Sequence, residues 1–228
     1  ASNVSVRRGG AHDVALALQI LNQSYRTTSF TPDWHAWKHL ECPFGPSRLI
    51  LAEVDSAVCG AFFALPWDYR LAGRTFAGAR TVDGGTLPAA RGRRVLGAMI
   101  ADEVGRWSSD GSPGVVVATA TDAARRSHVR NGALALPPLR YGICAPPLTR
   151  PARVDRDLDA LDSYVFQEDG MGTAWTGASL RWRIDQRGGN AYEVVTLCRA
   201  DGPNGLAYRT TTRGRVSIVI PVIMWGSQ

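Results

Sequence analysis

The residues with the clearest chemical signature are three arginines in a turn between a predicted strand and a predicted helix. Arg91, Arg93 and Arg94 flank Gly92, and apolar residues at helical spacing follow at once. The start of a helix presents unpaired backbone N–H groups and the positive end of its dipole. Arginine adds a planar fork of donors that suits phosphate. The turn is therefore predicted to bind an anion, although exposed arginines also occur at helix starts that bind nothing.

Basic residues dominate the charge of this chain, and nearly all of them are arginine. The 228 residues carry a net charge of +6, and Lys38 is the only lysine among 26 basic residues. Coding bias in a genome rich in G and C is the main explanation, because alanine and glycine are abundant too. The charge favours phosphorylated cofactors, acidic carrier proteins or nucleic acid as partners. The arginines are scattered and not interleaved with aromatic residues, so no nucleic acid is expected.

Composition bounds the class of protein. With 45% hydrophobic and 20% charged residues, the chain fits one large globular domain or two small ones. Four cysteines lie far apart without metal-ligand spacing, so neither a disulfide framework nor a metal is expected; they are Cys42, Cys59, Cys144 and Cys198. The longest apolar run, 216–225, is far shorter than the ~20 residues of a membrane span. No secretory signal begins the chain, which favours a cytoplasmic location.

Apolar periodicity predicts a mixed α/β domain over residues 1–150. The expected order is strand 3–6, helix 14–25 with Asp13 as its N-cap, helix 34–40, strands 49–54, 58–65 and 75–82, helix 95–107, strand 114–120 and helix 121–131. Turns at 55–56 and 71–73 make the three middle strands an antiparallel meander. The apolar run 114–120 predicts a strand covered on both faces. Prolines and a polar segment that ends near residue 162 place a boundary before a second domain, 165–228.

In this order of elements, residues 3–143 resemble the GNAT superfamily of acyl-CoA-dependent N-acyltransferases. The phrases that carry the resemblance include Trp37-Lys38, Cys42-Pro43-Phe44-Gly45, Gly60 and the stretch from Thr86 to Val95. The resemblance implies a mixed, mostly antiparallel sheet flanked by helices. It also implies that the loop of Arg91, Gly92, Arg93, Arg94, Val95 and Leu96 holds the coenzyme A diphosphate. Arg94 departs from the family's glycine, and Leu96 from its glycine or alanine.

The resemblance also assigns roles to two titratable residues and one strand. His128 stands where the family has a tyrosine that protonates the departing thiolate, and an imidazole can act as acid or base. A solvated surface histidine is the equally weighted alternative. Asp83 lies near the family's base at the end of a strand, with Glu53 as runner-up. The strand that ends at Val82 is expected to hold the pantetheine arm through backbone groups.

The acceptor pocket is expected to be lined by aromatic residues. They lie near the first two helices and near the turn between the second and third strands of the meander, because these elements flank the nucleophile in the family. Trp67 and Tyr69 have the best claim to substrate contact, with Trp34 beside them, whereas Trp37 is assigned to the core. Aromatic residues are more often simply core.

The segment 179–225 looks like a partial copy of the segment 34–82. Trp37 and Trp182 are separated by 145 residues, and so are Gly60 and Gly205. The copy predicts helix, strand, strand and strand in 165–228, without a second loop for a diphosphate. The apolar strand 216–220 needs a partner to avoid an open edge, and 139–144 is the expected one.

The predicted function is transfer of an acyl group from acyl-CoA directly to a primary amine of a small molecule. By analogy, the acceptor is expected to be a natural product such as an antibiotic aminosugar, and the donor a long-chain acyl-CoA. An acyl carrier protein is the alternative donor. The alternative function is a GNAT-like binding or regulatory module without catalysis, in which the altered loop and the missing tyrosine reflect lost coenzyme binding.

Overall fold

The computed structural model describes residues 4–109, 114–136 and 171–184, together with the backbone of the strands at 193–199, 202–213 and 216–225. The chain divides into two compact units. The first comprises residues 1–136 and 170–173, and the second comprises residues 137–169 and 174–228. The predicted boundary at 150–165 lies outside the described residues.

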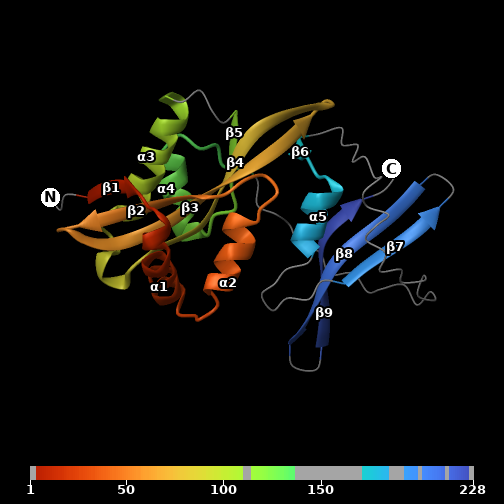
Figure 1. Ribbon diagram of the computed structural model, residues 1–228, viewed down its shortest axis with the longest axis horizontal. Coiled ribbons are helices and arrows are strands. Elements are labelled where there is room, and N and C mark those ends of the chain that lie inside the picture. The colour runs from red at the N-terminus through yellow and green to blue at the C-terminus, as the bar shows by residue number, and fades with distance from the viewer. Residues whose placement is uncertain are drawn as a thin grey trace. The chain divides into compact units, whose positions relative to one another are not determined.

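The first unit is built on one mixed sheet with the order β1-β2-β3-β4-β5 (Figure 1). The first four strands are antiparallel neighbours: β1 (Val4–Arg8), β2 (Arg48–Val54), β3 (Ala57–Leu71) and β4 (Arg74–Thr86). Strand β5 (Val115–Ala118) pairs with β4 in parallel, and β6 (Gly172–Thr173) pairs with β3. The mixed, mostly antiparallel sheet with flanking helices that the sequence predicted is therefore confirmed.

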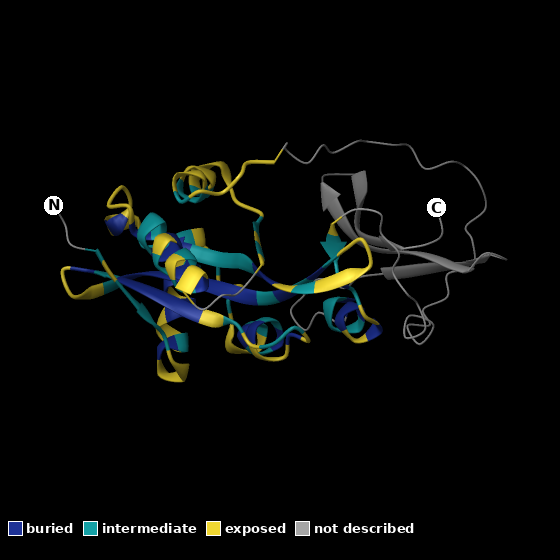
Figure 2. Cartoon of the chain, turned by 90° about the horizontal axis from the view of Figure 1, so that it is seen from above, coloured by how far each residue is buried: buried dark blue, intermediate teal, exposed yellow. Residues whose placement is uncertain are grey.

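Helices cover both faces of this sheet because the strands are apolar on both sides. Successive side chains of a strand point to opposite faces, and Leu49 and Leu51 pack with α1 (Val14–Tyr25), whereas Ile50 and Ala52 pack with α3 (Val95–Ser109). Figure 2 shows the buried residues concentrated along the strands and on the inner sides of the helices. The remaining helical segments of this unit are η1 (Ala11–Asp13), α2 (Pro32–His35), η2 (Ala36–Leu40), η3 (Pro88–Ala90) and α4 (Asp122–Arg130).

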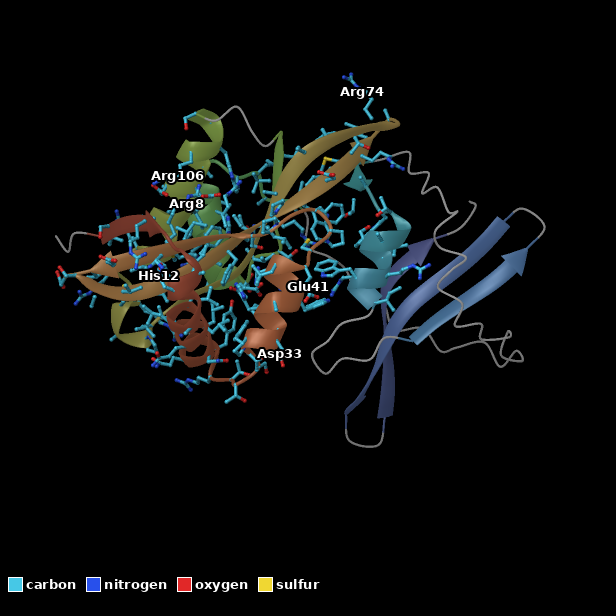
Figure 3. The ribbon with its side chains drawn as sticks, viewed as in Figure 1. Arg8, His12, Asp33, Glu41, Arg74 and Arg106 are labelled. Carbon is cyan, nitrogen blue, oxygen red and sulfur yellow. The ribbon has the colours of Figure 1, made fainter. Side chains whose placement is uncertain are left out.

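A buried carboxylate fixes α3 to the sheet. Glu103 of α3 is fully buried, and its two oxygens lie 2.6 Å from Arg8 Nη1 and 2.8 Å from Arg48 Nη2. Figure 3 labels Arg8 where β1 runs beside α3. A charge that is buried away from water is stable only when it is paired. The two arginines therefore stabilise Glu103 in its ionised form and hold α3 against β1 and β2.

Glycine at position 60 permits the close approach of α3 to β3. A Cβ at Gly60 would lie 2.6 Å from Val95 Cγ1 and 3.0 Å from Met99 Cε. We expect Gly60→Ala to lower the free energy of unfolding by about 1–3 kcal/mol through overpacking. The melting temperature measures this effect.

Gly105→Ala is the matched control for that prediction, because it makes the same substitution on the exposed side of α3, the helix that Gly60 faces. No heavy atom lies within 4 Å of the Cβ that it would add. Alanine forms helix better than glycine, so this variant should gain about 0.5–1 kcal/mol. A Gly60→Ala protein as stable as the wild type would contradict the tight contact.

Several local predictions need correction. Strands β3 and β4 extend to residues 71 and 74, so Trp67 and Tyr69 are buried strand residues and do not flank a turn. Among the described strands β5 pairs with β4 alone, and its side chains are partly exposed, so it is not covered on both faces as predicted. Asp13 occupies the N-cap position of α1, but its side chain makes no capping hydrogen bond. Its carboxylate instead accepts hydrogen bonds from the Arg7 guanidinium at 2.8 and 2.9 Å.

The described part of the second unit contains α5 (Gly177–Ile184) and an antiparallel sheet of β7 (Glu193–Arg199), β8 (Gly202–Arg213) and β9 (Val216–Trp225). This is the order of helix and three strands that the sequence predicted for 179–225. Strand β9 pairs with β8, and the expected partner segment 139–144 lies outside the described residues. None of the helices described here combines the length and the hydropathy of a membrane-crossing segment.

Candidate active site

A cleft opens where β4 and β5 stop pairing. The two strands pair only from Gly78 and Val115 to Thr81 and Ala118. Strand β4 then continues to Thr86, so its backbone beyond Thr81 has no β5 neighbour. The cleft has a volume of about 1480 Å³ and is lined by this free edge of β4, the loop and helix start at 90–98, and α4. Unpaired backbone N–H and C=O groups at such an edge can bind an extended ligand.

A β-bulge interrupts β4 at the centre of the cleft. Val82 pairs with Phe63, but Gly85 pairs with Ala61, so β4 carries one residue more than β3 in this stretch. Asp83 has a φ of 48°, in the left-handed region that side chains rarely adopt. Bulges re-aim side chains and often lie beside active sites. Here the bulge places Asp83 in the lining of the cleft.

The arginine loop leads directly into the start of α3. Gly92 and Arg94 have φ values of 83° and 62°. The Ala98 N–H donates to the Arg94 carbonyl at 3.0 Å, so the preceding N–H groups of the first helical turn point out of the helix. A left-handed arginine costs about 1–2 kcal/mol, which explains why the family has glycine at this position.

Two of the loop arginines are held by neighbouring segments. Arg91 donates to the Ser24 carbonyl at 3.0 Å, and Arg93 lies 3.1 Å from the Asp55 carboxylate. Both side chains also line the cleft, as does Arg94. Together with the free N–H groups of α3, these charges suit a diphosphate.

Helix α4 forms another wall of the cleft and carries His128. The Asn131 side-chain amide donates to the Gly97 carbonyl at 3.2 Å and to the Ser127 carbonyl at 2.8 Å, which ties the end of α4 to the start of α3. His128 is half-buried and lines the cleft. Burial lowers the pKa of His128 below 6.5. The imidazole is therefore neutral near pH 7, with one N–H donor and one acceptor nitrogen.

A cluster of charged groups surrounds the Asp83 carboxylate. Asp83 Oδ2 lies 2.6 Å from Lys38 Nζ and 3.4 Å from His39 Nε2. The His39 ring stacks on Phe63 at 4.0 Å, and its Nδ1 is 2.8 Å from Ser47 Oγ. Lys38 Nζ also lies over the Trp34 ring, 5.1 Å from its centre.

Two opposing influences set the charge of Asp83. Burial raises its pKa, but the hydrogen bond from His39 and the charge of Lys38 together outweigh burial and lower the pKa below 3.8. Burial likewise lowers the pKa of His39, which keeps that ring neutral. Asp83 is therefore an ionised carboxylate in a sheltered cleft, which can accept a proton or bind a cationic group.

The structure brings together most of the residues that the sequence singled out. Those that line the cleft are Val82, Asp83, Arg91, Gly92, Arg93, Arg94, Val95, Leu96 and His128. Among the described residues, Trp34, Trp67 and Tyr69 do not line it. The buried Trp67 donates from Nε1 to Thr173 Oγ1 at 2.9 Å, and Tyr69 is buried against β4, with its hydroxyl 3.5 Å from the Ala79 carbonyl oxygen. Trp34 does not line the cleft, but the centre of its ring lies 5.1 Å from Nζ of Lys38, which does.

Sequence reasoning missed Lys38 and His39 as site residues. Lys38 lines the cleft, whereas His39 is almost completely buried beside it. The available signal was the status of Lys38 as the only lysine of the chain.

Comparisons with known proteins agree with this geometry. A family model described as an acetyltransferase (GNAT) domain matches residues 5–127. A crystal structure of an Enterococcus faecalis V583 protein, described as a probable N-acyltransferase, aligns with a TM-score of 0.63 at 10% identity and covers 91% of this chain. The alignment spans 55% of that longer chain.

A GNAT family acetyltransferase from Brucella melitensis, solved with acetyl-CoA, aligns at 19% identity with a TM-score of 0.44, over 58% of this chain and 84% of its own. No curated protein sequence matches the chain. The Enterococcus structure shows that the fold is shared. The family model covers most of the residues that line the cleft, but His128, Arg130 and Asn131 lie just beyond its match.

Proposed function

The chain belongs to the GNAT acetyltransferase family, and on that premise we propose that it transfers an acyl group from an acyl-CoA thioester directly to a primary amine of a small molecule. One observation carries the proposal: a single cleft combines an anion site, an open strand edge, an ionised carboxylate and a neutral imidazole. Each of these groups has a part in acyl transfer. None of them is a cysteine, which agrees with transfer without a covalent intermediate.

The loop 91–97 and the free edge of β4 fit the two halves of an acyl-CoA donor. The arginines and the first N–H groups of α3 would hold the diphosphate. The backbone beyond Thr81 would hydrogen-bond the amides of the pantetheine arm and polarise the thioester carbonyl. Three arginines favour coenzyme A over an acyl carrier protein as donor, because the carrier presents a single phosphate.

Asp83 and His128 would handle the protons of the transfer. The amine must lose a proton to attack the thioester, and the ionised Asp83 is the acceptor that the cleft offers. The departing thiolate would take a proton from the N–H of the neutral His128 while the acceptor nitrogen of the ring takes one from solvent, so that the ring ends neutral. Both groups contact the reacting atoms in this proposal, so we treat both as catalytic residues.

We further propose a bulky acceptor or donor, in keeping with an aminosugar natural product and a long-chain acyl-CoA. The volume of about 1480 Å³ leaves room for an acceptor beside the coenzyme A thioester, because pockets that hold one small molecule usually measure about 300–1,000 Å³. Turnover measured with acetyl-, octanoyl- and decanoyl-CoA against a panel of aminosugars distinguishes the donors.

Calorimetric titration tests donor binding. We expect wild-type protein to bind at least one of acetyl-, octanoyl- and decanoyl-CoA at one site per chain. Gly97→Phe should weaken binding about tenfold or more, equivalent to about 1.4 kcal/mol. Gly97 lines the cleft, and no heavy atom lies within 4 Å of an added Cβ, so the new ring would stand in the cleft without disturbing the fold.

Gly105→Phe is the control, because Gly105 is also open, lies on the same helix and is not a lining residue. It should bind acyl-CoA as the wild type does. A folded wild-type protein that binds none of the three thioesters would refute both the site and the activity. Binding without acylation of any amine would favour the alternative of a non-catalytic module.

A further inference from the structure

Lys38 is an unusual residue in this chain by composition and by place. It is the only lysine of 228 residues. Its side chain is 22% exposed, and it lines the cleft from η2. Lysine differs from arginine in one property that matters here: its amine loses a proton readily and is then a nucleophile, whereas a guanidinium stays charged.

Lys38 Nζ lies where the proposed function places the acceptor amine, next to the Asp83 carboxylate. Nζ lies 2.6 Å from Asp83 Oδ2, the carboxylate to which the proposed function assigns the proton of the incoming amine. Asp83 belongs to the bulge of β4, within the free strand edge that would bind the thioester. A primary amine, a base and the expected thioester site therefore converge in one cleft.

The ion pair also favours transfer of a proton from the Lys38 ammonium to the Asp83 carboxylate. Burial alone raises the pKa of Asp83, and the cation of Lys38 is one of the influences that reverse it. When Lys38 gives up its proton, that influence disappears, and the carboxylate holds the proton more strongly. The neighbouring His39, kept neutral by burial, adds no competing charge.

We propose that Lys38 is itself an acyl acceptor, so that the protein acylates its own cleft when no small-molecule amine is present. The neutral Nζ attacks the thioester carbonyl carbon, a C–N bond forms, and the C–S bond breaks. The lysine ammonium loses two protons, of which one ends on the sulfur of coenzyme A and the other is released to solvent. The products are an amide on Lys38 and free coenzyme A.

The amide would inhibit the protein, because it removes the positive charge beside Asp83 and leaves the acyl group in the acceptor position. Activity toward an added amine should fall in proportion to the acylated fraction. This inference rests on the proposed function, since it uses the same donor and the same base.

Mass spectrometry of the intact chain tests the inference directly. Wild-type protein is incubated with octanoyl-CoA without amine and then digested for peptide mapping. We expect the octanoylated fraction to approach one group per chain, all of it on Lys38. The amino terminus is the other aliphatic amine and serves as an internal measure of ordinary chemical acylation.

Two variants separate enzymatic from chemical acylation. Lys38→Arg keeps the positive charge beside Asp83 but has no nucleophilic amine at this position, so it should gain no acyl group beyond the background on the amino terminus. Asp83→Asn should acylate Lys38 on the order of 10²-fold more slowly, the usual loss when a general base is removed. Circular dichroism and octanoyl-CoA titration verify that both variants are folded and loaded.

The other possible results also support or refute acylation of Lys38. Labelling of the amino terminus alone, or equal labelling of Lys38 in wild type and Asp83→Asn, would overturn the inference. If the protein binds octanoyl-CoA and acylates an added amine but leaves Lys38 free, the inference falls and the proposed function stands. If octanoyl-CoA and the other thioesters do not bind, both fall.

Discussion

Asp83→Asn is expected to lower turnover with an amine acceptor by about 10²- to 10⁴-fold, the range for loss of a general base. The asparagine amide has a similar shape and tolerates the left-handed φ of 48° at this position. It carries no negative charge, so it neither accepts the proton of the amine nor neutralises Lys38. Steady-state kinetics with release of coenzyme A thiol measure the effect.

Asp83→Asn should leave acyl-CoA affinity within a few-fold of the wild type, because the diphosphate site lies in the separate loop 91–97. Asp33→Asn is a suitable control, since Asp33 is an exposed carboxylate at the start of α2, labelled in Figure 3. It should turn over as the wild type does. Equal turnover of Asp83→Asn and Asp33→Asn would remove Asp83 from the mechanism.

His128→Phe is expected to lower turnover by about 10²- to 10⁴-fold while acyl-CoA still binds. Phenylalanine fills the half-buried space of the ring but offers no N–H to the departing sulfur and no nitrogen to carry a proton. The structural links of α4 run through Asn131 and the His128 backbone carbonyl, which the substitution retains. Full activity in this variant would return His128 to the role of a solvated surface residue.

The pH profile gives this prediction a second readout. Burial lowers the pKa of His128, so the neutral ring that the mechanism uses persists to below pH 6.5 and is lost only in more acidic solution. In the wild type, the logarithm of kcat/KM should therefore fall more steeply below that pKa than the ionisation of the amine alone requires. The profile of His128→Phe should lack this extra slope.

Much of the site was predictable because its residues are close in sequence. The turn around Gly92 and the apolar spacing from Val95 onward are local patterns, and a helix start makes an anion site by its own geometry. The order of the three-strand meander likewise follows from alternation and turn residues. The turn, the helix start and the meander depend on residues that are close together in the sequence, so the sequence is enough to predict them.

Burial along the extended hairpin of β3 and β4 was not predictable in the same way. Trp67 and Tyr69 were expected at an exposed turn, but the strands continue past them, and β6 and β4 supply partners for their polar atoms. Whether a strand residue faces a cleft or a covering segment depends on what packs over it. That covering includes Thr173, more than a hundred residues further along the chain.

The family resemblance, the turn 91–94 before α3 and the place of His128 on the helix that follows β5 could all be predicted from the sequence, because each depends on contiguous residues. The 2.6 Å contact between Lys38 and Asp83 could not, because it forms only when distant segments pack together. That contact requires the helical segment α2–η2 to pack over the bulge of β4, and a bulge re-aims a side chain that regular alternation would point elsewhere. The charge of the carboxylate follows from that packing, since burial and the nearby cation act on it only in the folded protein.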